Sequence, residues 1–230
     1  HLEEQPKEIA DCLAEHGMTP MALLLDSLSE EQVANVVAVH CTHSTQEELA
    51  RYVAAGGGVC ICPLTEAALG NGVFKSLEAS GGAVSLGTDC NARIDMLEEM
   101  RWLEYSQRLA RGRRGAVSAV VGPPSDDEDD DSDGMVDLPA QLLDCATAQG
   151  AAALGLGGET GRIEAGRWAD FALLDLGAPA LREVRDEHLL GAAVFGGAAE
   201  GLVVDTCVAG RWTSSSSGSG GGSGGSGGGG

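Results

Sequence analysis

The sequence has few positive charges, no long apolar run and no closely paired cysteines of the metal-binding kind. Only 14 Lys and Arg accompany 35 Asp and Glu, so the formal net charge is -21 and binding to nucleic-acid phosphates is not expected. No apolar run reaches the length of a membrane span, so no membrane partner is expected. The seven cysteines are never spaced as Cys-x-x-Cys, which argues against a zinc ribbon or a disulfide scaffold and for free thiols in a reducing compartment.

The chain also lacks an initiator methionine. It begins with His1, inside what reads as a motif, and we therefore expect a piece of a longer protein. The absence of a signal peptide then carries no information about targeting. We expect a cytoplasmic protein, with organelle targeting left open. The 43% of hydrophobic residues is enough for a sizeable core.

Strand-like and helix-like segments alternate through the first half of the chain. Short apolar runs predict buried strands at 33–39, 59–62 and 83–86. Helical spacing predicts helices at 6–17, 20–28, 44–55, 73–80 and 95–109, with a loop at 64–72. The alternation predicts parallel strands with right-handed crossovers. Because these strands, with one more implied before His1, cannot close a barrel, we predict an α/β fold that is the C-terminal half of a TIM-like (β/α)8 barrel.

Composition divides the chain into segments. Residues 1–111 form the expected half-barrel, and 138–157 form a further helix associated with it. Between them, 112–137 contains Gly-Pro-Pro and a dense acidic block, and it reads as a disordered surface insertion. From 158 to 213 we expect short strands and turns, with strands at 161–166, 171–176 and 203–208 and a hairpin that closes at 210–212. The Ser/Gly run 214–230 reads as a flexible tail.

The helix expected at 95–109 is amphipathic, as a helix that covers a barrel should be. Its predicted core face is apolar and consists of Met96, Leu97, Met100, Leu103 and Leu109. Its predicted outer face is charged and consists of Glu98, Glu99, Arg101, Glu104 and Arg108.

Candidate site residues stand where the predicted strands end: His1 with Glu4, His40, and Asp89. Parallel strands end on the same face of a barrel, which is where barrel active sites are built. Imidazole and carboxylate suit a divalent metal such as zinc. Simpler interpretations stay open, because Asp89 can cap the following helix and His1 can be an ordinary exposed residue. Of His40 and His43, we expect His40 to be the functional residue and His43 to be structural.

Several motifs follow one another in a familiar order. They are His1-Leu-Glu-Glu-Gln5, Val39-His-Cys-Thr-His43, Cys62-Pro-Leu-Thr-Glu66 with its continuation to Gly72, Gly87-Thr-Asp89, and the helix 95–109. Together they resemble the metal-dependent amidohydrolase superfamily, and within it the formimidoylglutamate deiminases. Residues 146–175 resemble the tail of the superfamily, which packs on the barrel and completes a small β-sandwich, so the resemblance implies a β-sandwich segment at 158–213.

The resemblance implies a role for each matching residue. His1 and Asp89 would bind one divalent metal, with zinc expected, and Asp89 would also act as a base. Glu4 would shuttle protons, and His40 would polarise the substrate or orient the attacking water. Gln5 and Glu66 would touch the substrate or support these groups. The reaction would hydrolyse a non-peptide C–N bond of a small-molecule substrate and release ammonia. For the assembly, a homodimer is the expectation to test.

Two other functions stay open. One is another aminohydrolase of the superfamily, of the guanine deaminase or chlorohydrolase type, because Ala68 and Asn91 stand where the resemblance leads us to expect Asn and His. The other is a non-catalytic half-barrel that serves as an interaction module. The superfamily's His-x-His pair, which supplies two further metal ligands, does not occur in this chain. We therefore expect little or no catalysis from residues 1–230 alone.

Overall fold

The computed structural model describes residues 1–81, 84–117, 138–197 and 201–214. The first sheet contains β1 (Val37–Val39), β2 (Gly58–Ile61) and β3 (Val84–Leu86), which pair in that order and run parallel, as the alternation predicts. Leu2 forms a parallel bridge with His40, so the first residues of the chain extend this sheet beside β1. From residue 118 the expected acidic insertion, and from 215 the expected tail, lie outside the described residues.

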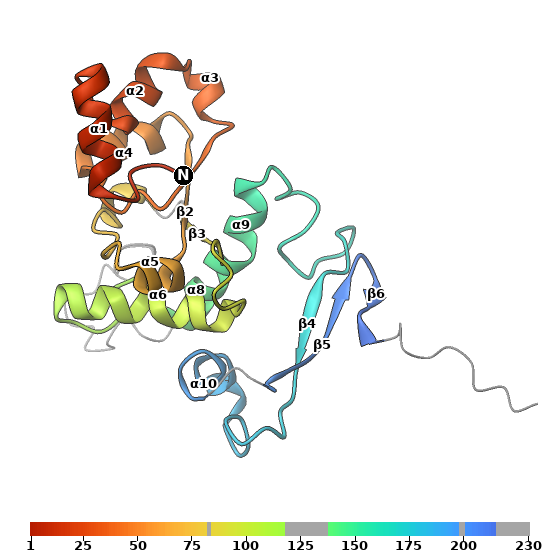
Figure 1. The fold of residues 1–230 in the computed structure, drawn as a ribbon. Helices are drawn as coiled ribbons and strands as arrows, with labels where there is room; N and C mark the ends of the chain where they lie inside the picture. The colour runs from red at the N-terminus through yellow and green to blue at the C-terminus, as the bar shows by residue number, and fades with distance from the viewer. Residues whose placement is uncertain (82–83, 118–137, 198–200, 215–230) are drawn as a thin grey trace, which may run out of the picture.

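Helices precede and separate these strands (Figure 1). They are α1 (Pro6–His16), α2 (Pro20–Ser27), α3 (Glu30–Val33), α4 (Gln46–Ala54), α5 (Pro63–Leu69) and, after β3, α6 (Met96–Arg111). Residues of the expected types start them. Thr19 and Thr45 cap α2 and α4 through their hydroxyls, and Asp95 caps α6 by accepting the N–H groups of Leu97 and Glu98.

The strand predicted at 33–39 is wrong in its first half. Its first residue, Val33, ends α3, which begins after Ser29; a turn follows, and β1 starts only at Val37. Ser29 and Gln32 form a reciprocal capping box, in which each side chain bonds the backbone N–H of the other. This local pair outweighs the β-branched character of Val33, whose side chain is buried from the helix.

The segment 63–80 also differs from the prediction. The expected loop 64–72 begins as α5, with Pro63 in its first turn and Gly70 in the left-handed conformation after its end. The expected helix 73–80 is reduced to the short 3-10 helix η1 (Glu78–Ser80). Its first part is held by tertiary bonds instead, because the Gln107 side chain donates to the Phe74 carbonyl at 2.7 Å and Ser76 Oγ donates to the Ser44 carbonyl at 3.1 Å.

The outer face predicted for α6 is partly buried. Glu99 and Glu104 are 0% exposed, whereas Leu109, expected in the core, is 84% exposed. Glu99 Oε2 accepts the N–H of Leu64, and Glu104 accepts the N–H groups of Ala116 and Val117. Burial raises the pKa of Glu99 to about 7. These carboxylates satisfy backbone donors of neighbouring segments, a role that helical periodicity does not reveal.

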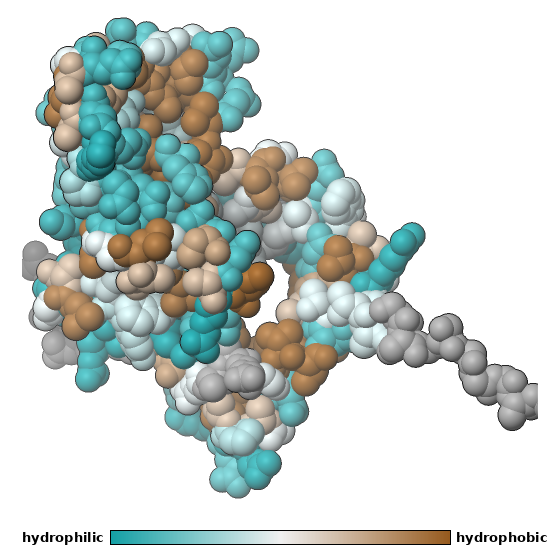
Figure 2. Space-filling view, in the orientation of Figure 1, coloured by the Kyte–Doolittle hydropathy of each residue, from teal (hydrophilic) through white to brown (hydrophobic). Residues whose placement is uncertain are grey.

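The C-terminal part contains a second sheet. Two helices, α8 (Leu138–Ala146) and α9 (Ala148–Ala153), replace the single helix expected there, and η2 (Asp186–His188) and α10 (Leu189–Phe195) follow. The strands β4 (Phe171–Leu174), β5 (Val203–Val208) and β6 (Arg211–Trp212) form an antiparallel sheet, while 161–166 forms turns instead of the predicted strand. This sheet exposes apolar side chains, among them Leu173, Val204 and Val208 (Figure 2).

The main core lies between the first sheet and its helices. It includes Val59 and Ile61 of β2, Leu49 of α4 and Met100 of α6. In the part of the chain that the structure describes, no helix is both long and apolar enough to cross a membrane.

Replacing Tyr52 with Phe is expected to lower the free energy of unfolding by about 1–3 kcal/mol, because buried backbone groups lose a partner. The Tyr52 hydroxyl is buried between the first two strands, 2.7 Å from the Val36 carbonyl, 3.0 Å from the Gly58 carbonyl and 3.1 Å from the Ala38 nitrogen. Urea unfolding followed by circular dichroism measures the change.

The matched control for this prediction is Tyr105→Phe. The Tyr105 ring stacks on Phe195, and its hydroxyl makes no hydrogen bond to the described residues. A Tyr52→Phe loss no larger than that of Tyr105→Phe would show that the hydroxyl does not help to join β1 to β2.

Candidate active site

The structure brings the predicted strand-end residues together at one edge of the first sheet. His1 precedes the bridge at Leu2, His40 follows β1, and Asp89 lies three positions after β3 ends at Leu86. Asp89 Oδ1 is 3.3 Å from His1 Nε2, and Asp89 Oδ2 is 3.7 Å from His40 Nε2. The two imidazole rings meet edge to face, with centroids 4.9 Å apart. Because Asp95 caps α6, the alternative that Asp89 caps this helix is wrong.

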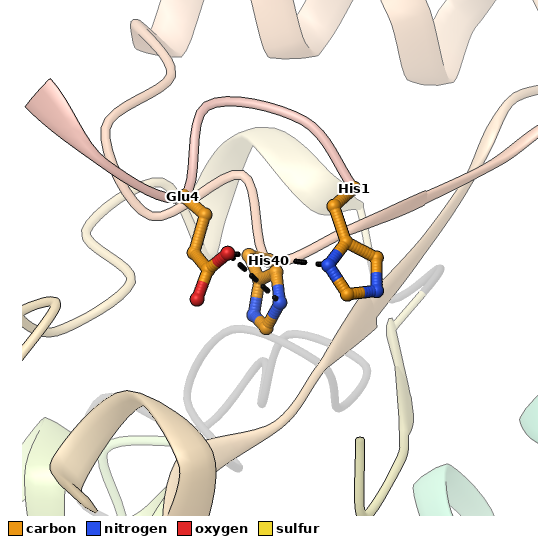
Figure 3. Close-up of side chains that lie close together, drawn as sticks. All are labelled: His1, Glu4 and His40. Carbon is orange, nitrogen blue, oxygen red and sulfur yellow. Dashed lines mark ion pairs between the residues drawn. The ribbon is translucent and has the colours of Figure 1, made fainter. Parts of the chain in front are cut away.

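Glu4 joins this group from the turn after Leu2 (Figure 3). Its Oε2 atom lies 3.8 Å from His40 Nε2 and 3.9 Å from His1 Nδ1. One ligand atom from each of His1, Glu4 and His40 fits within 4.8 Å of the others. Residues far apart in the sequence therefore present two imidazoles and two carboxylates to a common point.

The backbone at the site adopts unusual conformations. His40, Cys41 and Asp89 have positive φ angles of 76°, 50° and 36°, a region that L-residues rarely occupy and that costs roughly 1–3 kcal/mol per residue. Backbone hydrogen bonds hold the first two of these residues, since the His40 N–H donates to the Cys60 carbonyl at 2.8 Å and the Cys41 N–H to the Leu2 carbonyl at 3.0 Å. Strained φ and ψ angles of this kind cluster at functional sites, where they fix the direction of a side chain at the expense of backbone stability.

His40 is oriented by Glu66, a residue of α5. The imidazole is fully buried, and its Nδ1 lies 3.3 Å from Glu66 Oε1. A carboxylate can only accept, so Nδ1 carries the proton and Nε2 is left facing Glu4 and Asp89. Burial lowers the pKa of His40, but the Glu66 hydrogen bond and the charges of Glu4, Glu66 and Asp89 outweigh it, so the net pKa lies above the ordinary value.

Glu66 is itself held firmly. It is 4% exposed, and its Oε1 also accepts the N–H of Cys62 at 3.1 Å. The sequence placed Glu66 in a loop, but it lies in α5, which begins directly at the end of β2. The short connection explains how one carboxylate reaches both Cys62 and His40.

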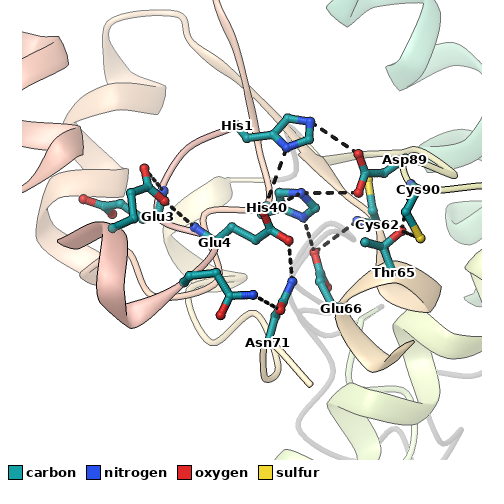
Figure 4. Close-up of polar contacts among 12 residues, drawn as sticks. His1, Glu3, Glu4, His40, Cys62, Thr65, Glu66, Asn71, Asp89 and Cys90 are labelled. Atoms are coloured by element: carbon teal, nitrogen blue, oxygen red, sulfur yellow. Dashed lines mark hydrogen bonds and ion pairs between the residues drawn. The ribbon is translucent and has the colours of Figure 1, made fainter. Parts of the chain in front are cut away.

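Gln5 does not reach the imidazoles and is linked to the site through Asn71. Gln5 Nε2 donates to Asn71 Oδ1, and Asn71 Nδ2 donates to Glu4 Oε1 at 2.6 Å (Figure 4). The sequence pattern predicts a loop at Asn71 and indicates no role for its side chain. The glycines on both sides of it, Gly70 and Gly72, were the available signal, since both have positive φ angles.

Glu8 and Glu3 support the turn that carries Glu4, and sequence reasoning missed both. The two Glu8 oxygens accept the N–H groups of Glu3 and Glu4 at 3.0 and 3.1 Å. The Glu3 side chain points away from the imidazoles and accepts from the Met21 N–H and Ser44 Oγ. Burial raises the pKa of Glu3. Glu3 and Glu8 therefore hold the backbone in place, whereas the Glu4 side chain faces the imidazoles.

The charge balance at the site fits a cation. Among the described residues, the ion pairs of Glu4 and Asp89 are with His1 and His40, and none is with Lys or Arg. The buried His40 Nε2 makes no hydrogen bond to any described residue. Carboxylates that have no Lys or Arg partner and lie beside a buried imidazole nitrogen are costly unless a further positive charge joins them. Imidazole nitrogen and carboxylate oxygen are a donor set that zinc accepts.

Comparisons with known proteins agree on one family. The family model described as the amidohydrolase family matches residues 1–213. Formimidoylglutamate deiminase of Pseudomonas aeruginosa is 35% identical over 214 residues, which make up 92% of this chain and 43% of that protein. A 5-methylthioadenosine/S-adenosylhomocysteine deaminase of Moorella thermoacetica is 36% identical over 219 residues, 90% of this chain and 44% of that protein. The chain thus spans less than half the length of these relatives.

Solved structures give the same picture. An amidohydrolase from Brucella melitensis superposes with a TM-score of 0.72 at 31% identity, and the aligned part makes up 92% of this chain and 43% of that protein. An adenosine deaminase from Xanthomonas campestris, solved with bound zinc, has a TM-score of 0.71 at 29% identity, and the aligned part makes up 92% of this chain and 44% of that protein. Since the family model extends over nearly the whole chain and the fold agrees with it, this chain belongs to the amidohydrolase family.

Proposed function

We propose that this chain is part of a metal-dependent hydrolase of non-peptide C–N bonds, a deaminase of the formimidoylglutamate type that releases ammonia. The observation that carries the proposal is the convergence of His1, Glu4, His40 and Asp89 at the carboxyl ends of parallel strands. The 35% sequence identity to the formimidoylglutamate deiminase of Pseudomonas aeruginosa supports the choice of reaction. In this proposal the first sheet is part of a (β/α)8 barrel and the second sheet is part of a β-sandwich.

We assign the cation to His1 and Asp89 and propose a single zinc ion. The donor set and the zinc in the Xanthomonas campestris adenosine deaminase support this choice. When bound, such a cation supplies Lewis acidity, which makes water acidic enough to attack a C=N carbon near neutral pH. The two remaining ligands that the resemblance implies, a His-x-His pair, would come from outside this chain.

The side chains of this chain carry the protons in the proposed reaction. Water adds to the formimidoyl carbon, the π electrons of the C=N bond move to nitrogen, and an Asp89 carboxylate oxygen takes a water proton. Glu4 Oε2 relays that proton to the nitrogen. It then relays the hydroxyl proton of the adduct in the same way, as the hydroxyl oxygen forms the C=O bond. The C–N bond then breaks, ammonia leaves with both protons of the water, and a formyl amide remains. His40, held at Nδ1 by Glu66, directs Nε2 toward the reacting atoms.

Reading the DNA upstream of His1 and expressing the extended protein tests the proposal. The upstream segment is expected to encode a strand that ends in His-x-His. The extended protein is expected to hold zinc and to release ammonia from N-formimidoylglutamate, whereas residues 1–230 alone are expected to show no turnover. Zinc content and an ammonia assay are the measurements.

Competing substrates separate the alternatives. Faster turnover of guanine or 5′-methylthioadenosine would contradict the formimidoyl assignment and support another aminohydrolase. Absence of zinc and of turnover on all of these substrates, with no His-x-His encoded upstream, would contradict an enzyme altogether and leave the non-catalytic half-barrel.

A further inference from the structure

We propose that Asn71 is a positioning residue that fixes the Glu4 carboxylate in the orientation needed for proton transfer. The inference rests on the proton-carrying role proposed for Glu4. Asn71 is an amide, which neither gains nor loses a proton near neutral pH, so its contribution must be geometric and electrostatic. It lies outside the group of residues that face the cation site directly.

The Asn71 amide is held on both of its ends. Its Nδ2 donates to Glu4 Oε1 at 2.6 Å, and its Oδ1 accepts from Gln5 Nε2. This pairing defines which atom of the amide is nitrogen, because only the nitrogen can donate to a carboxylate. The Asn71 backbone N–H donates to the Glu66 carbonyl at 2.9 Å, and the residue is 3% exposed. The donor that faces Glu4 is therefore buried and already in place.

The hydrogen bond selects one oxygen of Glu4 for chemistry. With Oε1 bound to Asn71, the other oxygen, Oε2, is directed toward His40 Nε2 at 3.8 Å and His1 Nδ1 at 3.9 Å. The Glu4 side chain is 19% exposed, so without Asn71 water competes for Oε1 and the carboxylate is free to rotate.

One short segment orients two groups of the site. Glu66, within α5, bonds His40 Nδ1, and Asn71, just after α5, bonds Glu4 Oε1. Gly70 and Gly72, with φ angles of 69° and 115°, turn the chain on either side of Asn71. Side chains at these angles would be strained, and a Cβ at Gly72 would also contact Thr42 and His43. The glycines thus let the segment return toward Glu4 directly after Glu66 has been placed.

The test compares Asn71→Asp with the wild type in the zinc-loaded enzyme extended upstream of His1. Asp has the shape of Asn but replaces the donor with a second carboxylate. We expect kcat to fall about 10- to 100-fold, the loss typical of a displaced reacting group, while KM and zinc content stay unchanged. Asn35→Asp makes the same chemical change on the exposed residue Asn35 and is expected to leave kcat unchanged. Asn71→Asp with kcat within twofold of the wild type would overturn the inference.

A double-mutant cycle separates this inference from the proposed function. If Asn71 acts through Glu4, adding Asn71→Ala to Glu4→Gln changes kcat less than twofold, although Asn71→Ala alone lowers it. Independent, multiplicative losses would overturn the positioning role while leaving that of Glu4 intact. Full turnover by Glu4→Gln would instead remove the proposed role of Glu4.

A spectroscopic readout needs neither metal nor a stable Asn71 variant. In metal-free protein, Glu4→Gln is expected to shift the side-chain amide proton resonance of Asn71, because a neutral acceptor replaces a charged one. Resonances of Asn35 are expected to stay in place. An unchanged Asn71 resonance would overturn the contact on which the inference depends.

Discussion

Replacing Asp89 with Ala in the enzyme extended upstream of His1 is expected to abolish ammonia release and to remove most of the bound zinc. The Asp89 oxygens lie 3.3 Å from His1 Nε2 and 3.7 Å from His40 Nε2, so the substitution removes both a cation ligand and the proposed base. Zinc content and the ammonia assay, measured on the same preparation, report the two losses together.

This change is not expected to remove a helix cap. Asp95, not Asp89, caps α6, and Asp89 has a positive φ that alanine tolerates poorly but that Asn accepts more readily. Asp89→Asn is therefore the companion variant, and Asp26→Asn on the exposed Asp26 is the control that should retain full activity. Turnover that survives in Asp89→Asn with zinc still bound would show that the carboxylate is neither ligand nor base.

Replacing Glu4 with Gln is expected to lower kcat by about 10²- to 10⁴-fold, the range for loss of a general acid–base group. Gln keeps the length of the side chain but cannot accept a proton at neutral pH. Because His1 and Asp89 remain in place, the zinc content is expected to stay near that of the wild type. Steady-state kinetics and metal analysis provide the two measurements.

The zinc measurement is decisive for the role of Glu4. Glu4 forms a compact three-residue group with His1 and His40, so it is also placed to be a metal ligand. Loss of zinc in parallel with kcat would replace the proton-carrying role with that of a ligand. Glu47→Gln, at an exposed position in the first turn of α4, is the control and is expected to change neither quantity.

The convergence of the site was predictable from the sequence because it depends on topology. Alternating strands and helices imply parallel strands, and parallel strands end at one edge. His40 directly follows β1 and Asp89 follows β3, so their proximity needs no knowledge of side-chain packing. The same reasoning placed His1 beside His40, since Leu2 pairs with His40 in parallel.

What the sequence did not reveal depends on contacts between distant segments. Glu99 and Glu104 read as solvent-facing on helical spacing, but each serves backbone N–H groups of another segment. The sequence pattern after Gly72 predicts a helix, but the side chain of Gln107 donates a hydrogen bond to the Phe74 carbonyl. Asn71 likewise gains its role only when α5 folds back toward Glu4. Periodicity detects which face of an element is apolar, not which polar group meets a distant partner.

The bond between Asn71 and Glu4 joins residues 67 positions apart in the chain, and the bond between Glu66 and His40 spans 26. Contacts of such high sequence separation raise contact order and close only after the loops between them have been ordered. The site therefore has no local precursor that forms early during folding. In the enzyme extended upstream of His1, a substitution that slows docking of α5 against the segment that carries Glu4 is therefore expected to delay the return of activity relative to the return of helical structure during refolding.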